Sequence, residues 1–313
     1  MRGAGVIVAG PTASGKSALA LRLAEALGGV VINADSMQLY RDLPILSARP
    51  GPEEERRVPH RLYGILPPTG QCSMGLWREM AVQACRQAWT QGLVPVVAGG
   101  TGLYLKALAE GLSPIPDIPE PVRSRTRALF AALGNAAFHR ELAGVDPEMA
   151  ARLHPGNSQR LMRAYEVMAA TGRSQASWQR EPPKEPPPGR FHSVLLLPPR
   201  DDLYKACDLR FRVMIERGAL EEVRALLAGG LPPSAPIRRV LGAAELIRHL
   251  EGQSSLQDAV AAAQQSTRRY AKRQFTWFRH QMDPDQMAHA QFSESLESEI
   301  IANIRHFLLT TTE

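Results

Sequence analysis

The N-terminal part of the chain alternates short, uniformly apolar runs with longer segments of helical periodicity. Apolar runs at residues 5–9, 30–32 and 93–98 have the length and β-branched content of buried strands. Between them, residues 17–27 repeat leucine at helical spacing, and residues 74–89 also predict a helix. Such alternation predicts an α/β fold with a parallel sheet and crossover helices, in which ligands bind beyond the carboxyl ends of the strands.

The pattern changes after residue 113. Residues 123–172 show helical periodicity without strand signals, between prolines at 114–121 and a second proline cluster at 181–189. Proline clusters on both sides indicate stiff connections. The sequence therefore predicts an all-helical inserted lobe at residues 114–189.

The strand pattern returns after this lobe. An apolar run at residues 192–197 predicts a further strand of the first sheet, and residues 204–218 and 256–280 predict helices. The catalytic core is therefore predicted to be discontinuous, with residues 1–113 and 190–313 forming a P-loop NTPase-like parallel sheet and its flanking helices.

Composition narrows the class of protein. The formal net charge is +6, and hydrophobic residues make up 44% of the 313 residues, enough for a substantial core. Three widely spaced cysteines without a CxxC pair predict neither a disulfide framework nor a zinc site. Without a long apolar run or a leader, we expect a soluble cytoplasmic protein with no membrane partner, and without a heptad seam we expect a monomer.

The strongest local motif follows the first predicted strand and opens the first predicted helix. It reads GPTASGKS and matches the G-x-x-x-x-G-K-[ST] phosphate loop. Its backbone N–H groups and the helix N-terminus attract phosphate oxygens, Lys16 neutralises charge, and the Ser17 hydroxyl can ligate Mg²⁺. ATP, GTP or a prenyl diphosphate would satisfy the same atoms. The predicted diphosphate and nucleotide site comprises Gly10, Pro11, Thr12, Ala13, Ser14, Gly15, Lys16 and Ser17.

Two further motifs follow predicted strands. Asp35 comes after the second strand, where an acid suits a metal contact or a general base, although a helix N-cap is an equal alternative. Residues 99–102, Gly-Gly-Thr-Gly, follow the third predicted strand. They form either a structural turn or a contact with a ligand. Taken singly, neither motif decides the chemistry.

The motifs together resemble one family, the tRNA dimethylallyltransferases, also called isopentenylpyrophosphate:tRNA transferases. The resemblance is carried by GPTASGKS at 10–17, DSMQLY at 35–40, VPHRL at 58–62, GGTGLYLKAL at 99–108, LHPGNSQRLMRAYE at 153–166 and TRRYAKRQFTWFR at 267–279. It runs in order across nearly the whole chain. Only the C-terminal residues carry no motif of this family.

The resemblance implies transfer of a dimethylallyl group from dimethylallyl diphosphate to N6 of adenine 37, beside the anticodon of tRNAs that read codons beginning with U. It implies that Asp35 removes the proton from the amine and that Thr101 holds a phosphate oxygen of the leaving group. Lys16 and Mg²⁺ are expected to stabilise that leaving group. Arg123 and Arg210 match family arginines that lie near the diphosphate. The arginine that Arg123 matches also lies near the tRNA.

The resemblance also implies a surface for the tRNA anticodon stem-loop. Helical spacing places Gln159, Arg160 and Arg163 on one face of a helix with an expected cap at Asn157 or Ser158. A solvated face is the ordinary explanation for such arginines, and the aromatics near residue 275 are expected to pack onto the core. The expected tRNA contacts are Asp35, Ser36, Met37, Gln38, Thr101, Arg123, Gln159, Arg160, Leu161, Met162, Arg163, Arg268, Lys272 and Arg273.

Three positions depart from the family pattern, and three other functions stay open. Leu46 stands where glycine is usual, Ala206 where arginine is usual, and Ala243 where tyrosine follows glycine. His60 is expected to be structural. The alternatives are prenylation of free adenine nucleotides, a P-loop kinase of a small metabolite, and a non-catalytic RNA-binding module; the kinase is disfavoured because no second Walker-type acid is evident.

Overall fold

The structure is a computed structural model that describes residues 3–311, apart from the side chains of residues 294 and 295. The chain divides into two compact units, residues 1–109 with 187–313 and residues 110–186. The predicted lobe of residues 114–189 begins four residues after the second unit does (114 − 110) and ends three residues after it (189 − 186).

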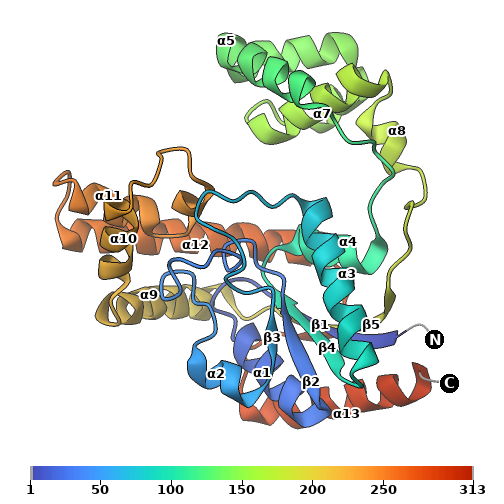
Figure 1. Cartoon of the computed structure of the whole chain (residues 1–313), viewed down its shortest axis with the longest axis vertical. Coiled ribbons are helices and arrows are strands. Elements are labelled where there is room, and N and C mark those ends of the chain that lie inside the picture. The colour runs from blue at the N-terminus through green and yellow to red at the C-terminus, as the bar shows by residue number, and fades with distance from the viewer. Residues whose placement is uncertain (1–2, 312–313) are drawn as a thin grey trace. The chain divides into compact units, whose positions relative to one another are not determined.

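The first unit contains one six-stranded sheet in which every pairing is parallel, as the sequence predicted (Figure 1). The strand order is β3-β2-β4-β1-β5-β6. The four predicted strands are present, whereas the short edge strands β3 and β6 were not predicted, because two or three residues carry no readable period. The strands are β1 (Gly3–Ala9), β2 (Gly29–Asn33), β3 (His60–Arg61), β4 (Val94–Gly99), β5 (Gly189–Leu196) and β6 (Gln286–Ala288).

Helices cover both faces of this sheet, so its strands are apolar on both sides. Along β1, Val6 and Val8 pack in a cluster with α1 (Lys16–Leu27) and α13 (Glu294–Thr311). Ile7 and Ala9 point the other way, into a cluster with α3 (Met74–Thr90) and α4 (Gly102–Glu110). The loops at the strand ends therefore stand on a rigid double-sided core.

A second group of helices packs beside the sheet and carries part of the site. The loop that follows β2 packs into their apolar cluster, in which Leu46 and Ala243 are both buried. Two of the three departures from the family pattern therefore share one packing environment. Within the described range, no helix is long and apolar enough to cross a membrane. The helices of this group are α9 (Arg200–Glu216), α10 (Ala219–Ala228), the 3₁₀ turn η1 (Pro236–Arg239), α11 (Ala243–Leu250) and α12 (Leu256–Gln281). The short helix α2 (Pro52–Arg57) has no buried residue and pairs with α1 through Arg57 and Glu25.

The second unit is entirely helical in its regular structure and has a core of its own. Phe138, Leu142 and Leu161 are fully buried in that core. Asn157, one of the two predicted cap residues, occupies the N-cap position of α7, but its side chain makes no capping bond. The Ser158 hydroxyl donates to the Asn135 side chain at 3.1 Å. Its helices are α5 (Glu120–Val145), α6 (Pro147–Arg152), α7 (Ser158–Thr171) and α8 (Gln175–Gln179).

Candidate active site

The phosphate loop connects β1 to α1 in the predicted position. Gly15 is the N-cap residue of α1, with a φ of 87° that favours glycine and no side chain to bond the first N–H groups. The first turn of α1 carries no acidic residue. The buried Ser14 hydroxyl has no hydrogen-bond partner in the described part of the chain. Free N–H groups at a helix start and an unsatisfied hydroxyl fit an incoming anion.

Two cations face this loop. The Lys16 ammonium donates to the Pro11 carbonyl at 3.2 Å, and the Arg210 guanidinium of α9 donates to the Thr12 hydroxyl. Among residues 3–311, neither cation forms an ion pair with a carboxylate. Burial lowers the pKa of Arg210, and Cys207 and Asp35 oppose that shift. Poorly solvated positive charges that form no ion pair among the described residues suit the loop to binding a diphosphate.

The titration of Lys16 leads to a pH prediction. Burial lowers the pKa of Lys16, Asp35 and Cys207 oppose this shift, Arg210 adds to it, and the resulting pKa is about 8. A lowered pKa means that free Lys16 loses its proton as the pH rises through 8, whereas a bound diphosphate favours the charged form. Affinity for dimethylallyl diphosphate is therefore expected to fall by about ten-fold per pH unit above that pKa.

Titration calorimetry from about pH 7 to about pH 9.5 would measure this dependence. Lys16→Met removes the titrating group, so its weaker binding should lack the alkaline limb. A wild-type dissociation constant that is flat across the range would contradict the assignment of this limb to Lys16.

Asp35 lies in a turn fixed by its neighbours. The Asn33 side chain accepts the Asp35 N–H at 2.8 Å and donates to the carbonyls of Asp35 and Leu62, each at 3.0 Å. The Asp35 carboxylate accepts the Met37 N–H at 3.0 Å. Asp35 therefore caps a turn and not a helix, so the alternative that Asp35 is a helix N-cap is wrong. Its second carboxylate oxygen is left for other chemistry.

Thr101 is joined directly to the Asp35 loop. Its N–H donates to the Ala34 carbonyl at 3.2 Å, and its hydroxyl oxygen accepts the Ser36 N–H at 3.0 Å. Gly99 permits this contact, since a Cβ there would lie 2.1 Å from the Ala34 carbonyl. The structure thus brings Asp35 and Thr101 together at the carboxyl edge of the sheet, as the order of the motifs predicted.

Three tyrosines around Asp35 were not identified from the sequence. Burial raises the pKa of Tyr63, Tyr104 and Tyr270, and the charge of Asp35 raises each further. Tyr104 also stacks on Trp77, with ring centroids 4.4 Å apart and planes 8° from parallel. Since these residues come from separate elements, no sequence spacing connects them to Asp35. The three hydroxyls therefore remain neutral under the influence of the Asp35 charge.

The residues next to Asp35 have defined contacts. The Gln38 side chain donates to the carbonyls of Ser47 and Ala48, at 3.0 and 2.8 Å, and so holds the loop that contains Leu46. Ser36 and Met37 are half-buried. Contact of Ser36, Met37 and Gln38 with a target base stays a prediction.

The basic residues of α12 differ in how free their side chains are to contact RNA. Arg268 forms an ion pair with Asp208 of α9 at 2.5 Å, whereas Lys272 and Arg273 are exposed. Phe278 is fully buried, and Phe275 and Trp277 pack against the same core, as expected. Lys272 and Arg273 are therefore the freer candidates for RNA contact on this helix.

His60 has a structural environment. Its Nδ1 lies 3.0 Å from the Val58 carbonyl, and its ring meets Tyr63 edge-on, with centroids 5.5 Å apart. Burial lowers the pKa of His60. These contacts favour the structural interpretation.

The residues predicted on the lobe belong to the second unit. Gln159 and Arg160 are exposed on α7, and Arg163 lies 3.8 Å from Glu166. The half-buried Arg123 has an Nε without a hydrogen-bond partner among the described residues. Leu161 corrects the prediction for one position, because its side chain is fully buried in the lobe core and cannot face RNA. Met162 is half-buried against the same core.

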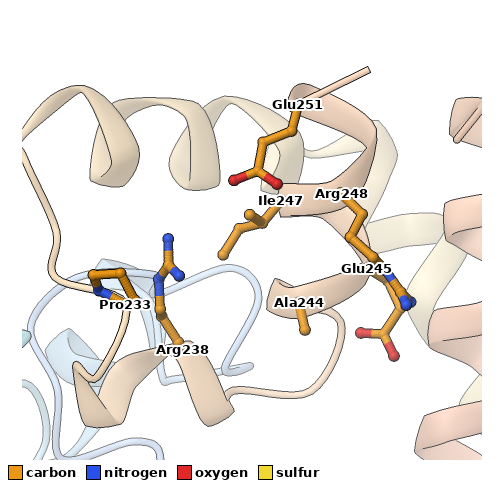
Figure 2. A pocket seen from close by; sticks show the side chains of 7 residues that line it. All are labelled: Pro233, Arg238, Ala244, Glu245, Ile247, Arg248 and Glu251. Atoms are coloured by element: carbon orange, nitrogen blue, oxygen red, sulfur yellow. The ribbon is translucent and has the colours of Figure 1, made fainter. Parts of the chain in front are cut away.

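A separate surface pocket of about 480 Å³ lies between η1 and α11. Figure 2 shows Arg238 and Glu251 pointing toward each other from opposite sides of it, with Ile247 between them. None of the predicted site residues lines this pocket. The residues expected to carry the chemistry therefore lie outside this pocket.

The sheet edge combines a phosphate loop, two cations that form no ion pair within the described part of the chain, an acid and a hydroxyl, and this combination defines the class of P-loop enzymes for diphosphate chemistry. A family model described as IPP transferase matches residues 38–281, and one described as isopentenyl transferase matches residues 5–65. The tRNA dimethylallyltransferase of Paramagnetospirillum magneticum is 56% identical over 305 residues, 97% of each chain. That of Rhodospirillum centenum is 57% identical over 278 residues, 88% of each. The chain belongs to the tRNA dimethylallyltransferase family.

Solved structures agree with this membership. The tRNA isopentenylpyrophosphate transferase of Bacillus halodurans has a TM-score of 0.70 at 29% identity, covering 100% of this chain and 98% of that one. A eukaryotic dimethylallyltransferase acting on tRNA has a TM-score of 0.81 at 25% identity, covering 97% of this chain and 77% of that one. The shared fold extends over the whole described chain.

Proposed function

We propose that this chain transfers the dimethylallyl group of dimethylallyl diphosphate to N6 of adenine 37, next to the anticodon of tRNAs that read codons beginning with U. The product is N6-(dimethylallyl)adenosine. The observation that carries this proposal is the placement of Asp35 and Thr101 near a loop whose cations, Lys16 and Arg210, feel the charge of Asp35 but form no ion pair among the described residues. One side of the site suits a leaving diphosphate and the other an amine that must lose a proton.

The reaction is a substitution at the allylic carbon. A bond forms between N6 and that carbon while the carbon–oxygen bond breaks, and the electron pair of the broken bond leaves with diphosphate. The N6 lone pair is delocalised into the adenine ring, so the amine attacks poorly until Asp35 takes its proton. Lys16, Arg210, the loop amides and the Thr101 hydroxyl stabilise charge that develops on the departing oxygens.

A magnesium ion fits the donors of this site. Among the described residues no cluster of three His, Cys, Asp or Glu side chains could hold a metal. Mg²⁺ commonly binds through substrate phosphates, water and one or two protein oxygens, so Ser17 at the start of α1 is sufficient on the protein side. A bound magnesium ion would neutralise part of the diphosphate charge.

The acceptor is a base within the tRNA anticodon stem-loop, and an adenine in a stacked loop must be drawn out before N6 can reach an acid. In the first unit, the exposed Lys272 and Arg273 suit phosphate contacts. In the second unit, the exposed Arg160 suits a phosphate contact, and Arg123, Gln159 and Arg163 are proposed as further RNA contacts of that unit. We further propose a monomer that acts in the cytoplasm. Neither prenylation of free nucleotides nor a small-metabolite kinase is supported by the comparisons, and retention of Lys16 and Asp35 opposes a non-catalytic RNA-binding module.

Mass spectrometry of nucleosides after incubation with Mg²⁺, dimethylallyl diphosphate and unmodified bulk tRNA tests the function. We expect adenosine to gain one five-carbon unit only in complete reactions, with no product when AMP replaces tRNA. Prenylated AMP without prenylated tRNA would overturn the proposed acceptor. ATP hydrolysis without any prenylated product would overturn the reaction.

The exposed Arg160 gives a prediction for tRNA binding. Arg160→Ala should weaken tRNA binding at every salt concentration and reduce the slope of log affinity against log salt by about 1, because one phosphate contact is lost. Affinity for dimethylallyl diphosphate should not change. Filter binding across a salt series measures both quantities. Arg152→Ala is the control, since Arg152 is an exposed arginine of the same unit that pairs with Glu148 at 2.6 Å; equal salt slopes for the two variants would remove Arg160 from the RNA surface.

A further inference from the structure

One buried side chain connects the two loops of the site. The Gln274 carbonyl oxygen, on α12, accepts the Thr12 N–H of the phosphate loop at 2.7 Å. Its amide nitrogen donates to the Gly100 carbonyl at 2.7 Å. Gln274 is 7% exposed, so both bonds are shielded from water. A single carboxamide therefore sets the separation between the phosphate loop and the loop that carries Thr101.

Glycine at two positions allows this helix to approach so closely. A Cβ on Gly100 would lie 2.4 Å from the Gln274 amide nitrogen, and a Cβ on Gly102 would lie 2.1 Å from the Trp277 ring. Gln274 and Trp277 are three residues apart on one helix and so share a face. The Gly-Gly-Thr-Gly segment is therefore shaped around α12, which a turn alone would not require.

The contacts continue from Gln274 to the reacting groups on both sides. On the acceptor side, Gly100 precedes Thr101, whose hydroxyl accepts the Ser36 N–H at 3.0 Å beside Asp35. On the leaving-group side, the Thr12 hydroxyl accepts a hydrogen bond from Arg210. Gln274 therefore joins the loop that receives Arg210, through Thr12, to the loop that carries Thr101 beside Asp35.

We propose that Gln274 is a positioning residue of the transfer reaction, which keeps the leaving-group donors and the Thr101–Asp35 side at a fixed separation. The inference rests on the proposed function, because it assumes the roles given to Lys16 and Thr101. Substitution at one carbon needs the attacking nitrogen and the departing oxygen in line, and a displacement of about 1 Å at such a site costs about 10²-fold in rate. Loss of the Gln274 carboxamide would allow the separation between the phosphate loop and the Thr101 loop to vary.

Single-turnover kinetics of two variants test the proposal. Gln274→Met keeps the length of the side chain and removes both bonds, so prenyl transfer should slow by roughly 10- to 100-fold while KM for each substrate changes less than about three-fold. Gln274→Glu keeps the acceptor for Thr12 but presents an ionised oxygen to the Gly100 carbonyl. Its rate relative to wild type should rise as the pH falls, since a protonated carboxyl can donate again.

The control is Gln264→Met. Gln264 lies on the same helix and donates to the Asp208 carbonyl of α9 at 2.9 Å, away from both loops. Its rate should equal that of the wild type. Thermal unfolding of every variant separates an effect on folding from an effect on positioning. If Gln274→Met proves less stable than the control, the pH dependence of the Gln274→Glu rate relative to wild type decides whether Gln274 positions the two loops.

A double-mutant cycle with Thr101→Ala separates positioning from a general structural role. If Gln274 acts through Thr101, Gln274→Met should slow the Thr101→Ala enzyme by no more than about three-fold, whereas independent roles give multiplying losses. Multiplying losses, or a wild-type rate for Gln274→Met beside a slow Thr101→Ala enzyme, would overturn the inference and leave the proposed function intact. A wild-type rate for Thr101→Ala would instead overturn the role proposed for Thr101.

Discussion

Replacing Asp35 with asparagine is expected to lower the single-turnover rate of prenyl transfer by roughly 10²- to 10⁴-fold, the range of general-base contributions. The amide oxygen can still accept the Met37 N–H that the carboxylate accepts at 3.0 Å, so the turn should persist. What is lost is the ability to take a proton from the adenine amine. Dimethylallyl diphosphate should bind as well as in the wild type or more tightly, because removing a negative charge beside Lys16 and Arg210 favours an anion.

Rapid-quench measurement of the transfer rate, with calorimetry for the diphosphate, checks both parts. Asp285→Asn is the matched control, because the Asp285 carboxylate also accepts a backbone N–H, that of Ser193 at 2.8 Å, at another strand of the same sheet. The rate per folded molecule should be unchanged there. An Asp35→Asn enzyme within about three-fold of the wild-type rate would remove Asp35 from the role of base.

Replacing Lys16 with methionine is expected to reduce both diphosphate binding and the rate of transfer, with a loss of roughly 10²- to 10³-fold in rate alone. Lys16 interacts with the bound diphosphate before the reaction. It interacts with a greater negative charge on the diphosphate as the carbon–oxygen bond breaks. Its removal therefore affects the ground state and, more strongly, the transition state.

Kinetics at saturating tRNA with varied dimethylallyl diphosphate separate the two losses. Lys205→Met serves as the control, since Lys205 is an exposed lysine of the same unit that pairs with Asp202 at 3.9 Å. It should keep wild-type constants. A Lys16→Met enzyme with raised KM but unchanged transfer rate would restrict Lys16 to binding.

The sequence by itself determined the features that are local. The phosphate loop is encoded in eight consecutive residues between a strand and a helix, so its position and conformation follow from the motif. The parallel sheet was predicted because strands covered on both faces read as continuous apolar runs, such as residues 5–9. Asp35 and Gly99 were placed at strand ends for the same reason.

Other features depended on packing between distant parts of the chain. β6 has only three residues, and α13 carries no family motif, yet β6 pairs with β5, and Ile300 and Ile304 of α13 are buried against the sheet. The burial of Leu161 could likewise not be predicted from the sequence, because a leucine in a basic helix can face either the core or the RNA. Pattern alone does not choose between these environments.

The tertiary structure also decided which residues complete the site. Arg210 reaches Thr12 across 198 positions, and Gln274 reaches it across 262. Family resemblance pointed to Arg210, but no spacing in the sequence singles out Gln274 or the tyrosines around Asp35. Local motifs determine where phosphate binds and where an acid stands, because they specify backbone conformation residue by residue. The distance between them is decided by the packing of α12 and α9 against the sheet, which exists only once the chain has folded.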